Sequence, residues 1–135
     1  MSTTRSEQYW IIHNSVIQSL KNKLETDGKY VVINPGTEEN QGGHIKRDGK
    51  YFYPDVIVRP IKGSKISEIY EIETEDTVDE TEAEQWKIFN EGSSDFYLVL
   101  PENSVNKTMA IINSKGFEIK DYFFYDDSCN VHHAL

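Results

Sequence analysis

The sequence predicts a single α/β domain, in which a mixed central β-sheet carries helices on both faces. Three observations lead to this fold class. Apolar residues recur at helical spacing in three segments, short apolar runs between turn residues indicate strands, and two neighbouring strands are close enough to form a hairpin. The predicted order is α-β-β-β-α-β-α-β. Because helical crossovers follow the hairpin, the sheet should contain both parallel and antiparallel strands.

The first helix is predicted from an apolar stripe, with Ser6 as a candidate N-cap and Gly28 as its end. The stripe consists of Trp10, His13, Ile17, Leu20 and Leu24. A short buried strand follows over 29–34. The next segment, 35–49, contains four glycines and is predicted to be a mobile, turn-rich loop.

The remaining elements alternate between strand and helix patterns. Apolar alternation predicts two strands over 51–59 and 66–74, joined by a hairpin connection. Further elements are predicted as a helix over 79–91, a strand over 95–101, a helix over 104–116 and a strand over 117–125. One domain is therefore expected over 1–125, followed by a C-terminal tail over 126–135.

Charge is distributed unevenly along the chain, which has a formal net charge of −9. Nine acids and no Lys or Arg lie between Glu68 and Glu84, and the rest of the chain is balanced. A bound divalent cation would reduce the repulsion within this acidic segment. Basic residues gather just before it, and these could contact a DNA backbone or form a solvated loop: Lys46, Arg47, Lys50, Lys62 and Lys65.

Several classes of protein are disfavoured. No apolar run approaches the roughly 20 residues that a membrane span needs, and the first ten residues lack the apolar core of a signal peptide. Cys129 is the only cysteine, so no intramolecular disulfide can form. We therefore expect a cytoplasmic protein without a membrane partner.

Strand alternation places three carboxylates on one side of the predicted hairpin. Asp55 lies on the first strand, and Glu71 and Glu73 share a face of the second. Oxygen ligands of this kind suit Mg²⁺ or Mn²⁺. The alternative is that the two glutamates form only the exposed edge of a hairpin.

These residues resemble a known motif. Pro54-Asp55, fifteen intervening residues and then Glu71-Ile72-Glu73 resemble the core of the PD-(D/E)XK, or restriction-endonuclease-like, nuclease superfamily. Its common α-β-β-β-α-β core matches the predicted order as far as Pro101. The resemblance implies a DNA endonuclease that hydrolyses phosphodiester bonds with Mg²⁺ or Mn²⁺, and it leaves a homodimer as an option.

The resemblance also assigns roles. Asp55 and Glu71 correspond to the metal-binding carboxylates, whereas Glu73 stands where the family usually has Lys. In Glu-x-Glu variants the second Glu can be a further ligand or a general base. The alternative is a nuclease fold that has lost catalysis and serves as a nucleic-acid- or protein-binding module. A third option is an unrelated small α/β protein.

Two helical residues are further candidates. Gln85 shares an inward face with Val78, Glu82 and Phe89, so it could contribute to an active site or bond a nearby loop. His13 lies on the apolar stripe of the first helix, where it could be a satisfied core residue or could join the metal site. Glu7 is the alternative contributor from that helix.

Other polar residues have structural explanations. Thr77 and Glu80 fit a capping box for the helix over 79–91, and Asp79, Glu80 and Glu82 would complement its dipole. The tail contains one Cys and two His residues but lacks the four-ligand spacing of a Zn site, so a disordered or docked tail is expected.

Overall fold

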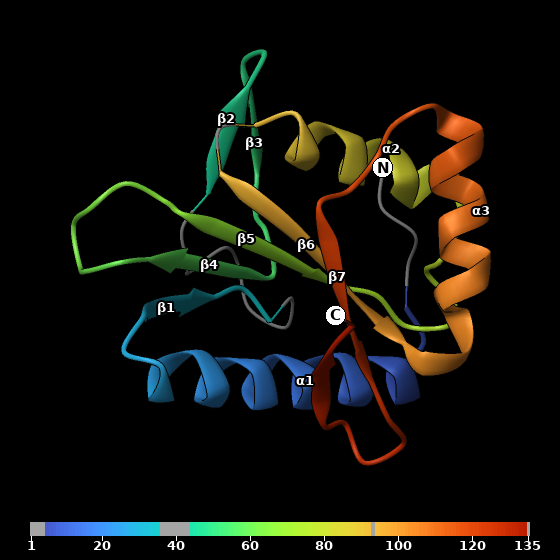
Figure 1. Cartoon of the computed structure of the whole chain (residues 1–135), viewed down its shortest axis with the longest axis horizontal. Coiled ribbons are helices and arrows are strands. Elements are labelled where there is room, and N and C mark those ends of the chain that lie inside the picture. The colour runs from blue at the N-terminus through green and yellow to red at the C-terminus, as the bar shows by residue number, and fades with distance from the viewer. Residues whose placement is uncertain (1–4, 36–43, 93, 135) are drawn as a thin grey trace.

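The computed structural model describes residues 5–35, 44–92 and 94–134 of the chain, as a mixed α/β fold with a curled central sheet (Figure 1). Its described helices are α1 (Glu7–Thr26), α2 (Glu80–Asn90) and α3 (Val105–Lys115), with a 3₁₀ turn over Glu102–Ser104. The strands are β1 (Tyr30–Ile33), β2 (Ile45–Arg47), β3 (Lys50–Phe52), β4 (Val56–Arg59), β5 (Glu68–Ile72), β6 (Asp95–Pro101), β7 (Asp121–Tyr125) and β8 (Val131–His133).

The main sheet has mixed strand direction, as predicted. Its order is β1-β4-β5-β6-β7-β8, while β2 and β3 form a separate two-stranded sheet. The pairs β1–β4, β4–β5 and β7–β8 are antiparallel, whereas β6 runs parallel to both β5 and β7. The predicted hairpin is therefore confirmed as β4–β5, and β5 lies inside the sheet.

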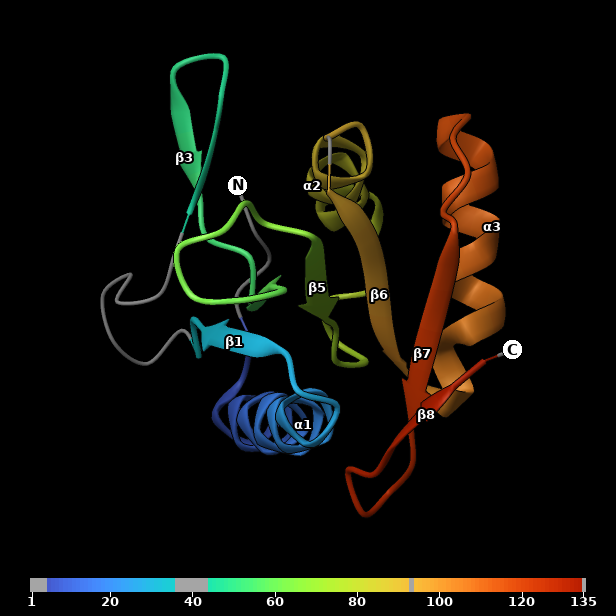
Figure 2. The same ribbon diagram turned by 60° about the vertical axis from the view of Figure 1, so that its left-hand side comes forward.

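Helices cover both faces of this sheet. One core cluster joins α1 to β1, β4 and β5, and a second joins α2 and α3 to the other side of β5 and β6. Figure 2 shows α1 on one side of the strands and α2 and α3 on the other. Strand alternation explains the division, because Tyr70 and Ile72 belong to the first cluster and Ile69 to the second.

The sequence pattern of α1 matches its burial. His13, Ile17, Leu20 and Leu24 of the predicted stripe are buried. Ser6 occupies the N-cap position, although its side chain makes no capping hydrogen bond. The prediction for α2 was wrong in one detail. Asp79, and not Thr77, caps this helix, and its side chain accepts from the backbone N–H of Glu82.

The strand predicted over 51–59 is divided at Pro54-Asp55. Residues 50–52 pair with β2, and residues 56–59 form β4. The β2–β3 hairpin turns at Asp48 and Gly49. Their φ values of 53° and 79° suit a tight turn in which both central residues are left-handed. Within the loop predicted over 35–49, residues 36–43 lie outside the described residues.

The predicted tail contains a strand of the main sheet. β8 pairs antiparallel with β7, so residues 131–133 extend the sheet beyond the boundary expected at 125. Asp126 holds the connecting turn, because its side chain accepts from the backbone N–H groups of Ser128 and Asn130. Of the two expected states of this segment, the structure has the docked one.

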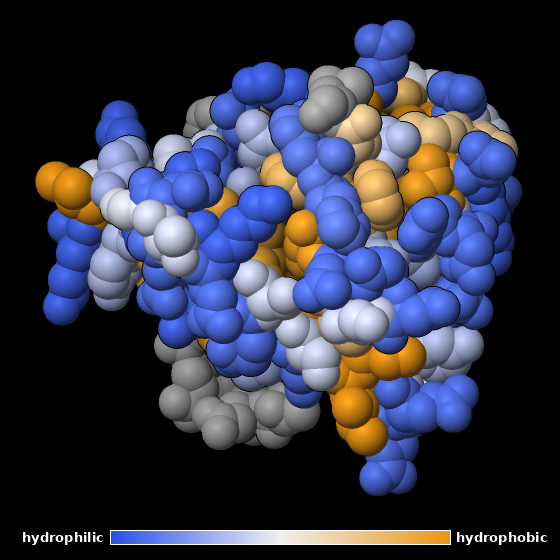
Figure 3. All heavy atoms as spheres, turned by 60° about the horizontal axis from the view of Figure 1, so that its bottom comes forward, coloured by the Kyte–Doolittle hydropathy of each residue, from blue (hydrophilic) through white to orange (hydrophobic). Residues whose placement is uncertain are grey.

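The surface seen from the side of α1 is mostly hydrophilic, with smaller apolar patches between the polar side chains (Figure 3). Within the described ranges, no helix is long and apolar enough to cross a membrane.

Candidate active site

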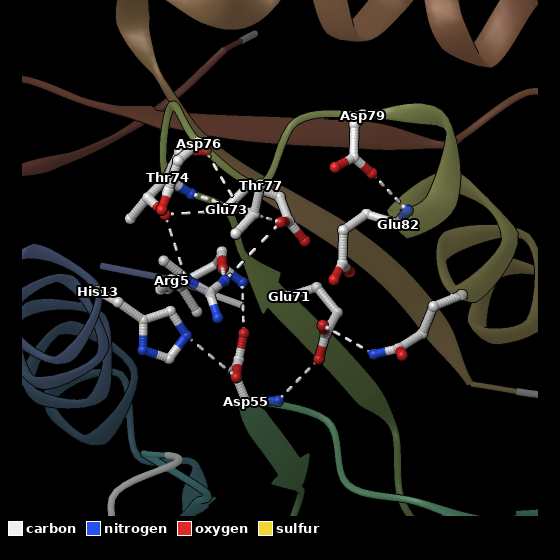
Figure 4. A network of polar contacts seen from close by, with 12 residues as sticks. Arg5, His13, Asp55, Glu71, Glu73, Thr74, Asp76, Thr77, Asp79 and Glu82 are labelled. Carbon is white, nitrogen blue, oxygen red and sulfur yellow. Dashed lines mark hydrogen bonds and ion pairs between the residues drawn. The ribbon is translucent and has the colours of Figure 1, made fainter. Parts of the chain in front are cut away.

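Asp55 and Glu71 lie side by side where β4 begins and β5 ends. The register pairs Val56 with Tyr70, which brings the preceding and following residues into contact. Glu71 Oε1 accepts from the backbone N–H of Asp55 at 2.9 Å, and Asp55 Oδ2 accepts from the backbone N–H of Ile72 at 2.8 Å. The predicted convergence of these two carboxylates is therefore present, and each is fixed by the other strand (Figure 4).

His13 reaches this pair from α1. Its side chain is fully buried, and Nε2 lies 3.1 Å from Asp55 Oδ1. The contact lacks hydrogen-bond geometry, and Nε2 has no hydrogen-bond partner among the described residues. On the other side of the ring, Nδ1 lies 2.9 Å from Asn14 Oδ1, which can only accept. A proton on Nδ1 satisfies this contact, and Nε2, the nitrogen that faces Asp55, is then an acceptor in the neutral ring and a donor in the protonated ring.

Gln85 extends from α2 to Glu71. Its Nε2 donates to Glu71 Oε2 over a long distance of 3.4 Å. The inward position predicted for Gln85 is confirmed. Burial, followed by the negative charges of Asp55 and Glu73, raises the pKa of Glu71 well above its ordinary range.

Glu73 is fully enclosed in a network of its own. Oε1 accepts from Thr77 Oγ1 at 2.6 Å and Oε2 accepts from Trp86 Nε1 at 2.9 Å. Arg5 Nη2 lies 3.7 Å from Oε1. Burial and then the charge of Glu82 raise the pKa of Glu73 to about 8, partly offset by Arg5 and the two hydrogen bonds. Glu73 therefore lies within the protein and not at a hairpin edge.

Arg5 and Glu82 complete the site, and neither was a candidate in the sequence. Arg5 Nη2 donates to the Ile72 carbonyl at 2.7 Å, and Nε donates to Thr74 Oγ1 at 3.2 Å. Nothing in the sequence marks Arg5, because it precedes the helix pattern. Glu82 is buried, although its charge was attributed to the helix dipole alone. Its place on the inward face of α2 was the signal that could have identified it.

The predicted DNA-contacting residues are only partly brought together. Lys46, Arg47 and Lys65 line one groove of about 550 Å³, between the β2–β3 hairpin, the β4–β5 connection and the end of α2. Lys50 and Lys62 are exposed and do not line this groove. None of the buried acidic residues of the site lines the basic groove.

As they stand, the His, Cys, Asp and Glu residues of the described ranges form no group of three or more that could hold a metal ion. Comparison of the chain with protein-family models, with curated proteins and with solved structures gave no match. Function is therefore inferred from the chemistry of the site alone.

Proposed function

We propose that the chain is a metal-dependent DNA nuclease of the PD-(D/E)XK type, which hydrolyses phosphodiester bonds. One observation carries the proposal: the buried Nε2 of His13 faces Asp55 Oδ1 at 3.1 Å, next to Glu71. Without the separate β2–β3 hairpin, the order is α1, β1, β4, β5, α2, β6, which supports the restriction-endonuclease-like core, because Asp55 directly precedes β4 and Glu71 lies on β5 as in that motif.

The residues present fit a divalent cation. In the neutral ring, His13 Nε2 is an acceptor like the carboxylate oxygen, so a positive charge between the two atoms, a proton or a metal ion, would stabilise their close approach. Adjacent ligands of an octahedral Mg²⁺ or Mn²⁺, each about 2.1 Å from the ion, lie about 3 Å apart. His13 and Asp55 have this spacing, and Glu71 lies beside them, because its Oε1 accepts from the backbone N–H of Asp55.

A cation held by these three side chains would lower the pKa of a bound water and offset the charge that develops on a phosphodiester. The chain itself fixes the ligands. Asn14 sets the tautomer of His13, and Gln85 orients Glu71. Glu73 already accepts two hydrogen bonds inside the protein, which favours an electrostatic role over direct contact with substrate.

The DNA backbone would lie along the basic groove. Lys46, Arg47 and Lys65 provide three positive charges there, and phosphate contacts position a nucleic acid without specifying its sequence.

Calorimetric titration with Mn²⁺ tests the metal site. Wild-type protein should bind, and Asp55→Asn, which keeps the shape of the side chain, should lose binding. Asp127→Asn removes an exposed acid elsewhere and serves as the matched control. Equal binding by wild type and Asp55→Asn would remove the metal site from the proposal.

Nicking of supercoiled plasmid with Mn²⁺ tests the reaction. Wild-type protein should cleave, and Glu71→Gln purified in the same way should not. Cleavage that persists in Glu71→Gln would contradict the assignment of activity to this site.

The second candidate is a nuclease fold without catalysis, acting as a nucleic-acid- or protein-binding module. The observation in its favour is the state of Glu73, which replaces Lys and is held by Thr77 and Trp86. Binding of Mn²⁺ without cleavage of supercoiled, linear, branched or single-stranded DNA would favour this second candidate.

A further inference from the structure

The β2–β3 hairpin has one face turned to the protein and one turned to solvent. Ile45 and Phe52 pack on the core cluster of α2 and α3, and the Phe52 ring lies 6.0 Å from that of Phe89. Because side chains alternate, Lys46 and Tyr51 point outward, whereas Arg47 and Lys50 share the face of Ile45 and Phe52. The register pairs Lys46 with Tyr51 on this outer face. In Figure 1 the hairpin projects from the body of the molecule above β5 and β6.

The outer face combines rings and a cation. Lys46 Nζ lies 5.6 Å from the centre of the Tyr51 ring. His44 meets Tyr51 edge-on at 4.7 Å, and its ring centre lies 5.7 Å from that of Tyr53. Tyr51 is 54% exposed. We refer to His44, Lys46, Tyr51 and Tyr53 together as the hairpin face.

Positive charge surrounds the hairpin face, although the chain as a whole carries −9. The hairpin itself contains three basic residues, Lys46, Arg47 and Lys50, and one acidic residue, Asp48. The basic groove with Lys65 adjoins it. An exposed tyrosine among cations suits a polyanion that also presents flat aromatic surfaces, which describes an unpaired nucleic-acid strand.

We propose that the hairpin face binds unpaired bases, so that the preferred nucleic acid has a single-stranded segment. This inference rests on the proposed nuclease function and narrows its substrate class. Tyr51 stacks on a base, while Lys46 contacts the neighbouring phosphate. A continuous duplex hides the faces of its bases and would meet only the cations. Tyr53 is two residues from Asp55, so this face ends next to the carboxylate site.

Fluorescence anisotropy with labelled oligonucleotides tests the proposal, with EDTA present so that no cleavage occurs. The same nucleotide sequence is offered as a single strand and as a duplex. Both forms are made in DNA and in RNA, to show which of the two nucleic acids the hairpin face prefers. Single strands should bind more tightly than duplex. Tyr51→Ala should weaken single-strand binding about tenfold without changing its salt dependence, and Tyr51→Phe should retain it.

Lys46→Ala should instead reduce the slope of log K against log salt by about 0.7, the value for one phosphate contact on a single strand. Tyr30→Ala is the matched control, because Tyr30 is also an exposed tyrosine but lies on β1. Circular dichroism checks that each variant is folded.

Tighter binding of duplex, or equal binding by wild type and Tyr51→Ala, would overturn the inference. These outcomes are separate from failure of the nuclease proposal. Tyr51-dependent binding without metal-dependent cleavage would support the binding role of the hairpin face and contradict the nuclease proposal. Cleavage that depends on Glu71 but not on Tyr51 would support the nuclease proposal and contradict the binding role of the hairpin face.

Discussion

Replacing Glu73 by Gln should change how stability depends on pH. The pKa of Glu73 rises from an ordinary value of 4.5 to about 8 in the folded chain, mainly because the carboxyl is buried. Between these values the folded chain holds a proton that the unfolded chain releases. The free energy of unfolding should therefore fall as pH rises, by up to about 1.4 kcal/mol per pH unit from this group.

The Gln variant has nearly the same shape and does not titrate. From pH 5 to pH 7, wild type should thus lose about 3 kcal/mol of stability relative to Glu73→Gln. Because the charge of Glu73 raises the pKa of Glu71, the same comparison is repeated in the Glu71→Gln background, where that coupling is absent. Urea unfolding in EDTA at several pH values measures the difference in stability, and Trp86 provides a fluorescence signal next to residue 73.

Glu118→Gln controls for the loss of a glutamate at an exposed position. A stability difference between wild type and Glu73→Gln that is constant across this pH range would refute the raised pKa. A difference in favour of wild type that grows with pH would show that the pKa is lowered and that Arg5 dominates over burial.

Three further predictions concern other parts of the molecule. His13→Gln should weaken Mn²⁺ binding at least about tenfold in calorimetry while Asn14→Ala has a smaller effect, because only His13 faces Asp55; equal effects would contradict direct ligation. Trp86→Phe should lower the free energy of unfolding by about 1–3 kcal/mol, measured by circular dichroism in urea, because it leaves a buried Glu73 oxygen without its donor; an unchanged value would argue against that hydrogen bond. Removal of residues 131–135 should lower the melting temperature and promote self-association in gel filtration, because β7 becomes an unprotected edge strand; a stable monomer would show that β8 is dispensable.

The main sheet and the central carboxylate pair could be predicted because their signals are local and periodic. Alternation over β4 and β5 fixes both the pairing and the side on which Asp55 and Glu71 lie. The position of His13 followed from the stripe of α1, although its contact with Asp55 depends on how the helix lies across the sheet.

The short strands escaped prediction because three residues contain too little periodicity. The Asp48-Gly49 pair was a genuine hairpin signal, but it lay within a glycine-rich segment that indicated a loop. β8 contains two histidines and becomes a strand only because the edge of β7 is there to pair with it. Arg5 contacts Ile72 and Thr74, which are 67 and 69 residues away in the sequence. No local sequence pattern predicts such a contact.

If the nuclease proposal holds, the burial of Glu71, Glu73 and Glu82 sets stability and activity against each other. Carboxylates in an apolar setting make a fold less stable than matched apolar side chains would. Selection for heat resistance alone would therefore tend to neutralise these positions first and to remove the proposed ion binding with them. An engineer who wishes to stabilise this protein and retain its chemistry should work at the exposed ends of the helices and leave the centre of β5 unchanged.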